Sequence, residues 1–231
     1  MNGILIDIEG LDGSGKETQA QLLYTYVKNK FSKKVGYVSF PNYKSDSSAL
    51  VKMYLNGEFG SDPFKINAFA VSSFFAIDRF LTFENGLKKD YQAGKWIIAN
   101  RYTSSNALYQ MPKLERQNWE NYLTWVYDYE YNKLGLPKPD IVIYLDVPLE
   151  ISQQLMDKRY KGDSSKKDLH ESNLNFLKHC KEAAEYSAHR DSWNIIKCVE
   201  NNKLKSIEEI HEEIVLIIKN KYSKLLKFIN D

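Results

Sequence analysis

The chain has 231 residues, of which 43% are hydrophobic and 27% are charged. This size and composition suit one substantial hydrophobic core, so we expect a single domain covering residues 1–231. The 32 basic and 30 acidic side chains leave a formal net charge of +2, which gives no reason to expect a nucleic-acid partner.

The cysteine and histidine positions exclude several classes of protein. Cys180 and Cys198 have no metal-binding or redox spacing, and the four histidines are scattered. A chain of this size needs no disulfide, so a reducing cytoplasm suits it. The N-terminus shows no signal-peptide pattern, and no apolar run approaches the roughly 20 residues that span a bilayer. We therefore expect a soluble, cytoplasmic protein with no membrane partner.

Apolar, β-branched runs alternate with helical patterns from the N-terminus onward. Nearly continuous apolar strands with helices between them are typical of a parallel sheet that is covered on both faces. The sequence therefore predicts a doubly wound, five-stranded parallel α/β fold that binds ligands at the carboxyl ends of its strands. The expected strands are Ile4–Ile8, Val35–Phe40, Trp96–Ala99, Ile141–Leu145 and Trp193–Val199.

Three segments between the strands differ in pattern. Ser48–Gly94 is a long helical stretch rich in phenylalanine, and Leu114–Leu134 carries apolar residues at near-helical spacing, so both predict packed helices. Lys158–Lys167 is polar, charged and turn-prone, which predicts an exposed loop between helices. Because mobile loops often cover active sites, we expect a lid at about residues 158–168.

The turn after the first strand has the composition of a phosphate-binding loop. Glycines can expose converging backbone N–H groups at a helix N-terminus, and Lys16 adds a mobile positive charge. A strand before the turn and a helix after it are the context that this motif requires, although a tight turn with an incidental lysine is the alternative. The candidate ATP-binding residues in this turn are Gly10, Leu11, Asp12, Gly13, Ser14, Gly15, Lys16, Glu17 and Thr18.

Two acidic residues make this loop irregular. The position after the lysine should hold Ser or Thr to bind magnesium, but here it is Glu17, and Thr18 one place later is not geometrically equivalent. Asp12 gains nothing electrostatically from a neighbouring triphosphate, so it either contacts another partner or stabilises the turn itself.

Several motifs occur together in one order and with one spacing, and their set resembles the thymidylate kinase family. The likeness runs from the first strand to about Glu171 and is weaker beyond it. It implies a P-loop kinase with a lid that uses ATP and Mg²⁺ to phosphorylate dTMP to dTDP for dTTP synthesis. The motifs are Glu9 with Gly10–Lys16, Phe75–Arg79, Asn100–Tyr102, Leu136–Asp140 and Tyr144–Pro148.

The resemblance assigns substrate-binding roles residue by residue. Phe75 matches a ring that stacks on the thymine base and Arg79 an arginine that reads a thymine carbonyl; one helical turn places both on one face. Arg101 matches the arginine that holds the acceptor phosphate, which a guanidinium fork suits. Asp12 corresponds to the aspartate that contacts the 3′-hydroxyl. The remaining substrate-binding candidates are Phe40, Pro41, Ser105, Asn106 and Tyr109, the last of which resembles a tyrosine that disfavours a 2′-hydroxyl. For each arginine the alternative is an ordinary surface ion pair.

Phosphoryl transfer needs alignment, magnesium and positive charge around the transferred group. Lys16 and Arg159 are the expected suppliers of that charge, with Arg101 and Asp12 as the other catalytic candidates. The family delivers an extra arginine from the phosphate loop or from the lid, and this loop offers Gly13, so the lid must serve. Arg159 is the only arginine among the lid's basic residues, the others being Lys158, Lys161, Lys166 and Lys167. The alternative for this run is a solvated flexible loop. Asp168 and Glu171 loosely resemble the acidic pair that follows the lid.

The chain departs from the family pattern at three positions. The usual Asp-Arg-Tyr is Asn100-Arg101-Tyr102, the loop carries Glu17, and Tyr43 stands where an arginine is often found. We hypothesise that Glu17 takes over part of the metal-water coordination lost at Asn100. The alternative is that Glu17 points to solvent and stabilises the helix N-terminus by about 0.3 to 1 kcal/mol. At Tyr43 one acceptor-phosphate contact is in doubt, which leaves more of that work to Arg101.

Two other functions share parts of this pattern. A deoxynucleoside kinase would use a carboxylate after the first strand as a general base, a role that Glu9 could fill, but it would give Arg101 less purpose. A P-loop switch, or an ATP-dependent binding module with slow hydrolysis, predicts a guanine-specifying or helicase-like second motif, and the sequence contains neither. We further expect an adenine pocket around Asn201 and Lys203, and the family implies a homodimer.

Overall fold

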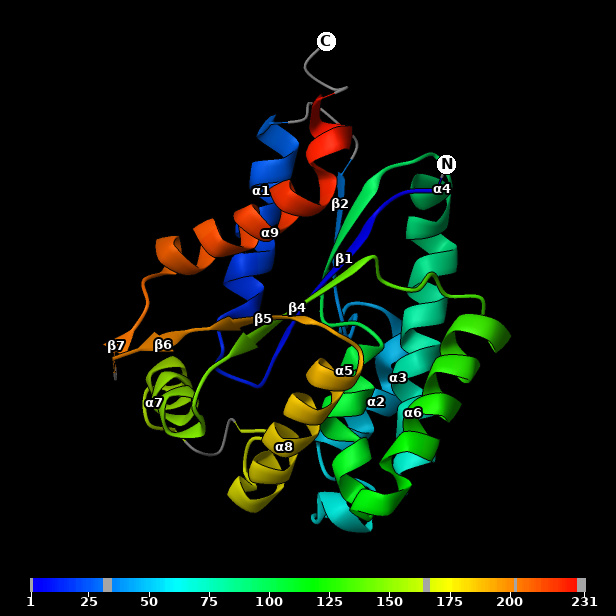
Figure 1. The fold of residues 1–231 in the computed structure, drawn as a ribbon. Helices are drawn as coiled ribbons and strands as arrows, with labels where there is room; N and C mark the ends of the chain where they lie inside the picture. The colour runs from blue at the N-terminus through cyan, green and yellow to red at the C-terminus, as the bar shows by residue number, and fades with distance from the viewer. Residues whose placement is uncertain (1, 31–34, 164–166, 202, 228–231) are drawn as a thin grey trace.

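The computed structural model describes residues 2–30, 35–163, 167–201 and 203–227. Five parallel strands form one sheet in the order β2-β3-β1-β4-β5, which confirms the predicted fold class (Figure 1). The first strand lies at the centre, paired with β3 on one side and β4 on the other. The strands are β1 (Leu5–Gly10), β2 (Val35–Ser39), β3 (Trp96–Asn100), β4 (Ile141–Asp146) and β5 (Asn194–Lys197).

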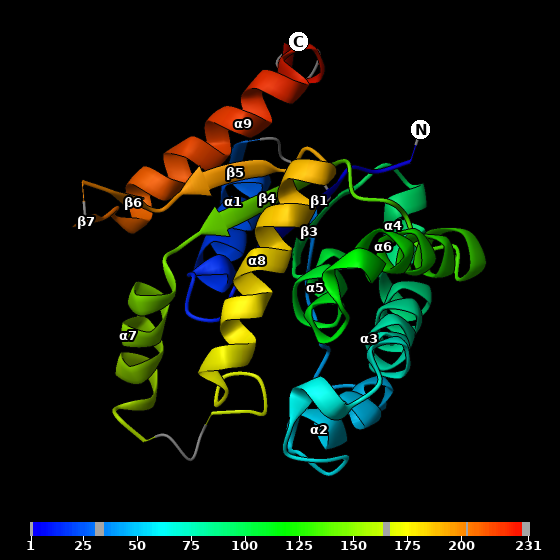
Figure 2. The same cartoon turned by 60° about the horizontal axis from the view of Figure 1, so that its bottom comes forward.

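Helices cover both faces of this sheet (Figures 1 and 2). Helices α1 and α9 lie on one face, and α5 and α8 lie on the other, with α3 and α6 beyond them. The main helices are α1 (Lys16–Lys30), α2 (Ala49–Leu55), α3 (Ala68–Thr82), α4 (Lys88–Gln92), α5 (Ser104–Tyr109), α6 (Trp119–Tyr127), α7 (Leu149–Tyr160), α8 (Leu174–Arg190) and α9 (Ile207–Lys227). Among these described helices, none is long and apolar enough to cross a bilayer.

Strand alternation decides which side chains meet which helices. Ile6 and Ile8 of β1 belong to the core beneath α1 and α9, where they pack with Leu23 and Ile214. Since successive side chains of a strand point to opposite faces, the residues between and after them point toward α5. Two of these are carboxylates, Asp7 and Glu9, and both accept hydrogen bonds from α5. The central strand therefore brings buried acidic groups to the base of the site.

The expected long helical stretch before β3 is divided into several pieces. Turns at Gly57 and Gly60, both with positive φ, separate α2 from α3, and a π-helical segment, Phe83–Leu87, joins α3 to α4. The expected helix of the second insertion likewise ends in a π-helix, Asp128–Lys133, after α6. Short 3₁₀ turns occupy 46–48, 63–65, 111–113 and 116–118.

Two local predictions differ from the structure. The loop expected over 158–167 begins later, because α7 continues to Tyr160. Lys161, the C-cap residue of this helix, adopts a left-handed conformation with φ 54°. Basic residues favour a helix C-terminus, and the first glycine comes only at Gly162. The expected last strand is shorter and is followed by a separate antiparallel hairpin of β6 (Val199–Glu200) and β7 (Lys203–Leu204). Residues 164–166 of the predicted lid, Lys166 among them, lie outside the described part of the chain.

Candidate active site

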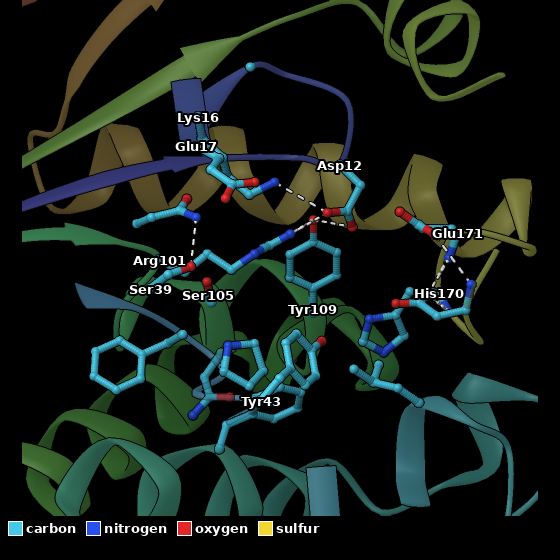
Figure 3. Close-up of a pocket in the computed structure, with 18 of the residues that line it drawn as sticks. Asp12, Lys16, Glu17, Ser39, Tyr43, Arg101, Ser105, Tyr109, His170 and Glu171 are labelled. Atoms are coloured by element: carbon cyan, nitrogen blue, oxygen red, sulfur yellow. Dashed lines mark hydrogen bonds and ion pairs between the residues drawn. The ribbon is translucent and has the colours of Figure 1, made fainter. Parts of the chain in front are cut away.

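A cavity of about 340 Å³ lies at the carboxyl ends of β1, β2 and β3 (Figure 3). This size is in the range of small-molecule sites. Four residues of the predicted ATP loop, Gly10, Leu11, Gly13 and Ser14, are not part of its lining. The predicted site residues that line it are Asp12, Gly15, Lys16, Glu17, Thr18, Phe40, Pro41, Phe75, Arg79, Arg101, Ser105, Asn106, Tyr109 and Arg159.

The glycines shape the loop between β1 and α1. Gly13 and Gly15 have φ values of 80° and 82°, which side-chain-bearing residues rarely adopt. A Cβ atom at Gly13 would stand 2.4 Å from the carbonyl oxygen of Ser152, so the loop packs directly against α7. At Gly15 a Cβ would meet nothing within 4 Å, which leaves its backbone open to a ligand. The loop therefore offers N–H groups at a helix N-terminus, where anions bind.

Lys16, Asp12 and Arg101 form a cluster at the centre of the cavity (Figure 3). The Lys16 ammonium Nζ lies 3.2 Å from Asp12 Oδ1 and donates to the carbonyl of Leu11 at 3.2 Å. The Arg101 guanidinium donates through Nη2 to the same Asp12 oxygen. Burial alone would raise the pKa of Asp12, but Arg101 and Lys16 outweigh it and hold that pKa well below its usual value. Two cations thus converge on one carboxylate inside the cavity.

A left-handed backbone aims the Arg101 side chain. Its φ of 69° is unusual for a residue with a Cβ atom, and such strain persists where the surroundings fix it. Its amide donates to the carbonyl of Ile8 at 3.1 Å, which ties the end of β3 to β1. The guanidinium also lies 5.0 Å from the Tyr109 ring, whose hydroxyl donates to Asp12 Oδ2 at 2.9 Å. The predicted residues Asp12, Arg101 and Tyr109 therefore form one connected unit.

Arg79 is buried and paired with a residue that the sequence analysis did not single out. Its Nε and Nη2 donate to the two carboxylate oxygens of Glu130 at 2.7 and 2.6 Å. Both side chains are almost fully buried, with 1% and 0% exposed. No known motif marks Glu130, but it follows Leu123 and Val126 at helical spacing, which places it on the buried face of that segment.

Aromatic rings form the wall of the cavity beyond these charges. Phe75, one turn before Arg79 on α3, meets the Tyr54 ring edge-on, with ring centroids 6.3 Å apart. His170, which was also missed, stacks on Tyr109 at 5.2 Å, and its Nε2 shares a 2.6 Å hydrogen bond with the Tyr54 hydroxyl. Burial lowers the pKa of His170 to about 3, so the ring is neutral. Phe75 can therefore form an apolar surface for a planar ligand, while Tyr109 is held in place by His170.

The lid segment reaches the same cavity. Arg159 and Tyr160, in the last turn of α7, both line it. The Tyr160 hydroxyl donates to Glu171 at 2.8 Å, and the amide of Leu169 donates to the carbonyl of Leu55 at 3.1 Å, which joins the segment after the lid to α2. Burial, and next the charge of Asp12, raise the pKa of Asp168 to about 7. Of the other predicted lid cations, Lys158 and Lys161 are exposed and Lys167 pairs with Asp157 at 2.9 Å.

Oxygen atoms suited to a cation lie near the start of α1. Glu17 is exposed and lines the cavity together with Asn100 and Ser39. The Asn100 amide donates to Ser39 Oγ at 2.9 Å, while its buried Oδ1 has no partner among the described residues. No group of three or more His, Cys, Asp or Glu side chains in the described segments could hold a metal alone. Mg²⁺ typically binds through one or two carboxylates, waters and substrate phosphates, and Glu17 with the free Asn100 oxygen fits that pattern.

The candidate adenine segment does not line the cavity. Asn201 and Lys203 belong to the β6–β7 hairpin, and neither is among the lining residues. The segment just after this hairpin does approach the phosphate loop, because Gln19 of α1 donates to the carbonyl of Ile207 at 2.8 Å.

Comparisons with known proteins agree with one another. The model of the thymidylate kinase family matches residues 8–214. The chain is 29% identical to a thymidylate kinase of Plasmodium falciparum over 92% of this chain and 88% of that one, and 31% identical to one of Mycobacterium tuberculosis over 69% and 73%. The solved thymidylate kinase of Candida albicans superposes with a TM-score of 0.71 at 23% identity, covering 95% of this chain and 92% of that one, so it supports the fold. The chain belongs to the thymidylate kinase family.

Proposed function

We propose that this cavity transfers the γ-phosphoryl group of ATP to the 5′-phosphate of dTMP, the reaction of the thymidylate kinase family. The observation that carries the proposal is the convergence of Lys16 and Arg101 on Asp12, from two separate strand ends. Lys16 begins the helix after the phosphate loop and would bind ATP. Arg101 follows the next strand of the sheet and would bind the acceptor phosphate. A phosphate acceptor explains why two cations are held here.

The proposed roles divide the cavity into three parts. Residues 10–18 and Arg159 surround the ATP phosphates, and Arg101 with Asp12 holds the acceptor phosphate and sugar. Phe40, Pro41, Phe75, Arg79, Ser105, Asn106 and Tyr109 enclose the thymine base and deoxyribose. Arg159 supplies charge to the transferred group from the lid, as an arginine does in related phosphoryl-transfer sites.

Magnesium is part of this proposal. Glu17 and Asn100 would hold it, through water molecules and together with the ATP phosphates. When bound, the ion neutralises charge that develops on the phosphate oxygens. The unpartnered Oδ1 of Asn100 beside a free carboxylate supports these two residues as its ligands.

The position of Glu9 favours a nucleotide over a nucleoside acceptor. A nucleoside kinase needs a carboxylate that is free to accept the acceptor's proton. Glu9 is 0% exposed, does not line the cavity and accepts a 2.6 Å hydrogen bond from Ser105. Its environment suits a structural carboxylate better than a general base.

We also propose that the chain forms a homodimer through α3. Phe69, Ile77 and Leu81 are spaced on one face of this helix and are 39%, 37% and 37% exposed. Exposed apolar rows of this kind mark protein interfaces. Light scattering after gel filtration should give twice the monomer mass, and Ile77→Glu should reduce it to that of the monomer.

The free, buried Cys180 and Cys198 suit a reducing cytoplasm, which cell fractionation would test.

One assay tests the main proposal. Purified protein is incubated with ATP, Mg²⁺ and, separately, dTMP, dUMP, dCMP, AMP and thymidine, and ADP formation is measured. We expect dTMP to be the preferred acceptor and thymidine to give no product. Turnover of thymidine without turnover of dTMP would reject the proposal in favour of a nucleoside kinase.

A further inference from the structure

Glu130 accepts hydrogen bonds from the side chains of three residues, one in α3 and two at the start of α5. Arg79 of α3 occupies one position on each carboxylate oxygen. Thr103, just before α5, donates its hydroxyl to Oε2 at 2.8 Å, and Asn106 of α5 donates Nδ2 to Oε1 at 2.8 Å. Each oxygen of this fully buried carboxylate thus accepts from two donors, which is close to its full capacity.

These contacts determine the orientation of the Asn106 side-chain amide. Its Nδ2 faces Glu130 Oε1 and also the backbone carbonyl of Ser72 at 3.3 Å, and neither of these atoms can donate. A turned amide would place two acceptors against Oδ1, so only the observed orientation is compatible with both neighbours. Because Asn106 lines the cavity, Oδ1 is the amide atom left for a ligand.

The Glu130 carboxylate also determines which guanidinium nitrogen of Arg79 is available to a ligand. Glu130 engages Nε and Nη2, which leaves Nη1 as the guanidinium nitrogen not taken by the pair. Arg79 also lines the cavity. The lining of the cavity therefore includes an N–H donor from Arg79 and a carbonyl acceptor from Asn106, and Glu130 contacts both side chains.

We infer that Glu130 is a specificity-determining positioning residue, which sets the hydrogen-bond polarity of the base pocket and so selects a 4-oxo over a 4-amino pyrimidine. The inference rests on the proposed function. A thymine base has a carbonyl oxygen at position 4 and an N–H at position 3, which complement the Arg79 donor and the Asn106 acceptor. A cytosine base reverses both groups. It would set an amino group against the guanidinium and a ring nitrogen against the amide oxygen, and sites of this kind reject such analogues strongly.

The change Glu130→Gln alters the polarity at this position while keeping its size. If the new amide nitrogen replaces Oε1, it faces donors from Arg79 and Asn106; if it replaces Oε2, it faces donors from Arg79 and Thr103. Either orientation loses a bond to Arg79. The first orientation also favours a turned Asn106 amide, which would present N–H to the ligand and suit cytosine.

The experiment compares dTMP with 5-methyl-dCMP, because these nucleotides differ only at the edge that the pocket reads. For wild type and Glu130→Gln we measure kcat/KM with each acceptor, the KM for ATP, and the Kd of each acceptor by calorimetry. We expect Glu130→Gln to reduce the preference for dTMP by at least about tenfold, while the KM for ATP changes by less than about twofold. Equal losses with both acceptors would mean that Glu130 only supports the fold, and would overturn the inference.

Two further variants sharpen the result. Glu130→Asp keeps a group that only accepts hydrogen bonds, so it should raise the KM for dTMP but keep most of the preference for dTMP over 5-methyl-dCMP. Loss of this preference in Glu130→Asp would overturn the inference even if Glu130→Gln does not fold. Asp128→Asn is the matched control, because Asp128 lies in the same π-helix but its side chain is 47% exposed, and it should behave as wild type. The calorimetry separates the two proposals: a wild-type protein that prefers dTMP in binding but does not phosphorylate it would reject the proposed function alone.

Discussion

Asp12 and Arg101 form an ion pair in the middle of the cavity although they are 89 positions apart in the chain. One follows β1 and the other follows β3, and these strands are neighbours in the sheet. The pair also has a third member, because Lys16 contacts the same Asp12 oxygen. One carboxylate thus neutralises both cations, and a phosphate group that binds them would compete with it.

This arrangement predicts opposite effects of Asp12→Asn on binding and on turnover. The change removes the negative charge that competes with phosphates, so ADP should bind at least as tightly as in wild type. Loss of the proposed contact between Asp12 and the acceptor should lower kcat with dTMP about 10²-fold, as misplacement of reactants does. Calorimetry with ADP and steady-state kinetics measure the two effects. Weaker ADP binding with unchanged kcat would show that Asp12 serves the ATP side.

The sequence predicted the parts of this site that depend on local motifs. The phosphate loop, Phe75 with Arg79, and Arg101 all follow strand ends or share a helical turn, so spacing alone places them near the carboxyl edge of the sheet. Glu130 could not be assigned in this way. It lies in an insertion, and its role depends on contacts with α3 and α5 that only the folded chain creates. The available signal was an acidic residue at helical spacing from the apolar Leu123 and Val126.

His170, which stacks on Tyr109, could not be assigned from the sequence for the same reason. It is the third residue after Lys167 in a polar segment, and nothing in its spacing separates it from a solvated loop. The amide of its neighbour Leu169 donates to the end of α2, and this long-range contact buries the ring against Tyr109. Likewise, the hairpin after β5 has only two residues in each strand, which is too short for an alternation pattern to reveal.

Arg159 should contribute to turnover more than to substrate binding. It stands in the last turn of α7 and faces the cavity, where it can reach charge that develops on the transferred group. We expect Arg159→Ala to lower kcat by about 10²- to 10³-fold, as removal of one electrostatic stabiliser does. The KM values for ATP and dTMP should change only a few-fold. Lys158→Ala is the matched control, since Lys158 is exposed in the same turn but does not line the cavity. Equal effects of both changes would indicate a general charge effect of the lid.

Glu17 should affect the requirement for magnesium. The negative charge of Glu17 acts on Tyr37, a neighbour of Asn100: burial first and the Glu17 carboxylate second raise the pKa of Tyr37. We expect Glu17→Gln to raise the Mg²⁺ concentration that gives half-maximal activity several-fold, with a smaller effect at saturating Mg²⁺. Asn100→Asp should lower that concentration, because it adds a carboxylate to the same place. If the dependence of activity on Mg²⁺ concentration is the same in Glu17→Gln as in wild type, Glu17 does not bind the metal and only stabilises the N-terminus of α1.

Asp7 should make the stability of the protein depend on pH. Burial, and next the charge of Glu9, raise the pKa of Asp7 well above its usual value. The native state then keeps a proton that the unfolded state has lost, so the free energy of unfolding falls as the pH rises from the unfolded pKa toward the folded one. Asp7→Asn replaces the carboxyl by an uncharged group of the same shape and removes this loss. We expect its melting temperature to exceed that of wild type by a few degrees at pH 8 and to approach it near pH 4. Glu9, whose pKa burial also raises, is present in both proteins, so the difference between the two curves reports Asp7 together with its interaction with Glu9. A constant difference across this pH range would mean that the substitution acts through packing against Ser104 and not through the proton.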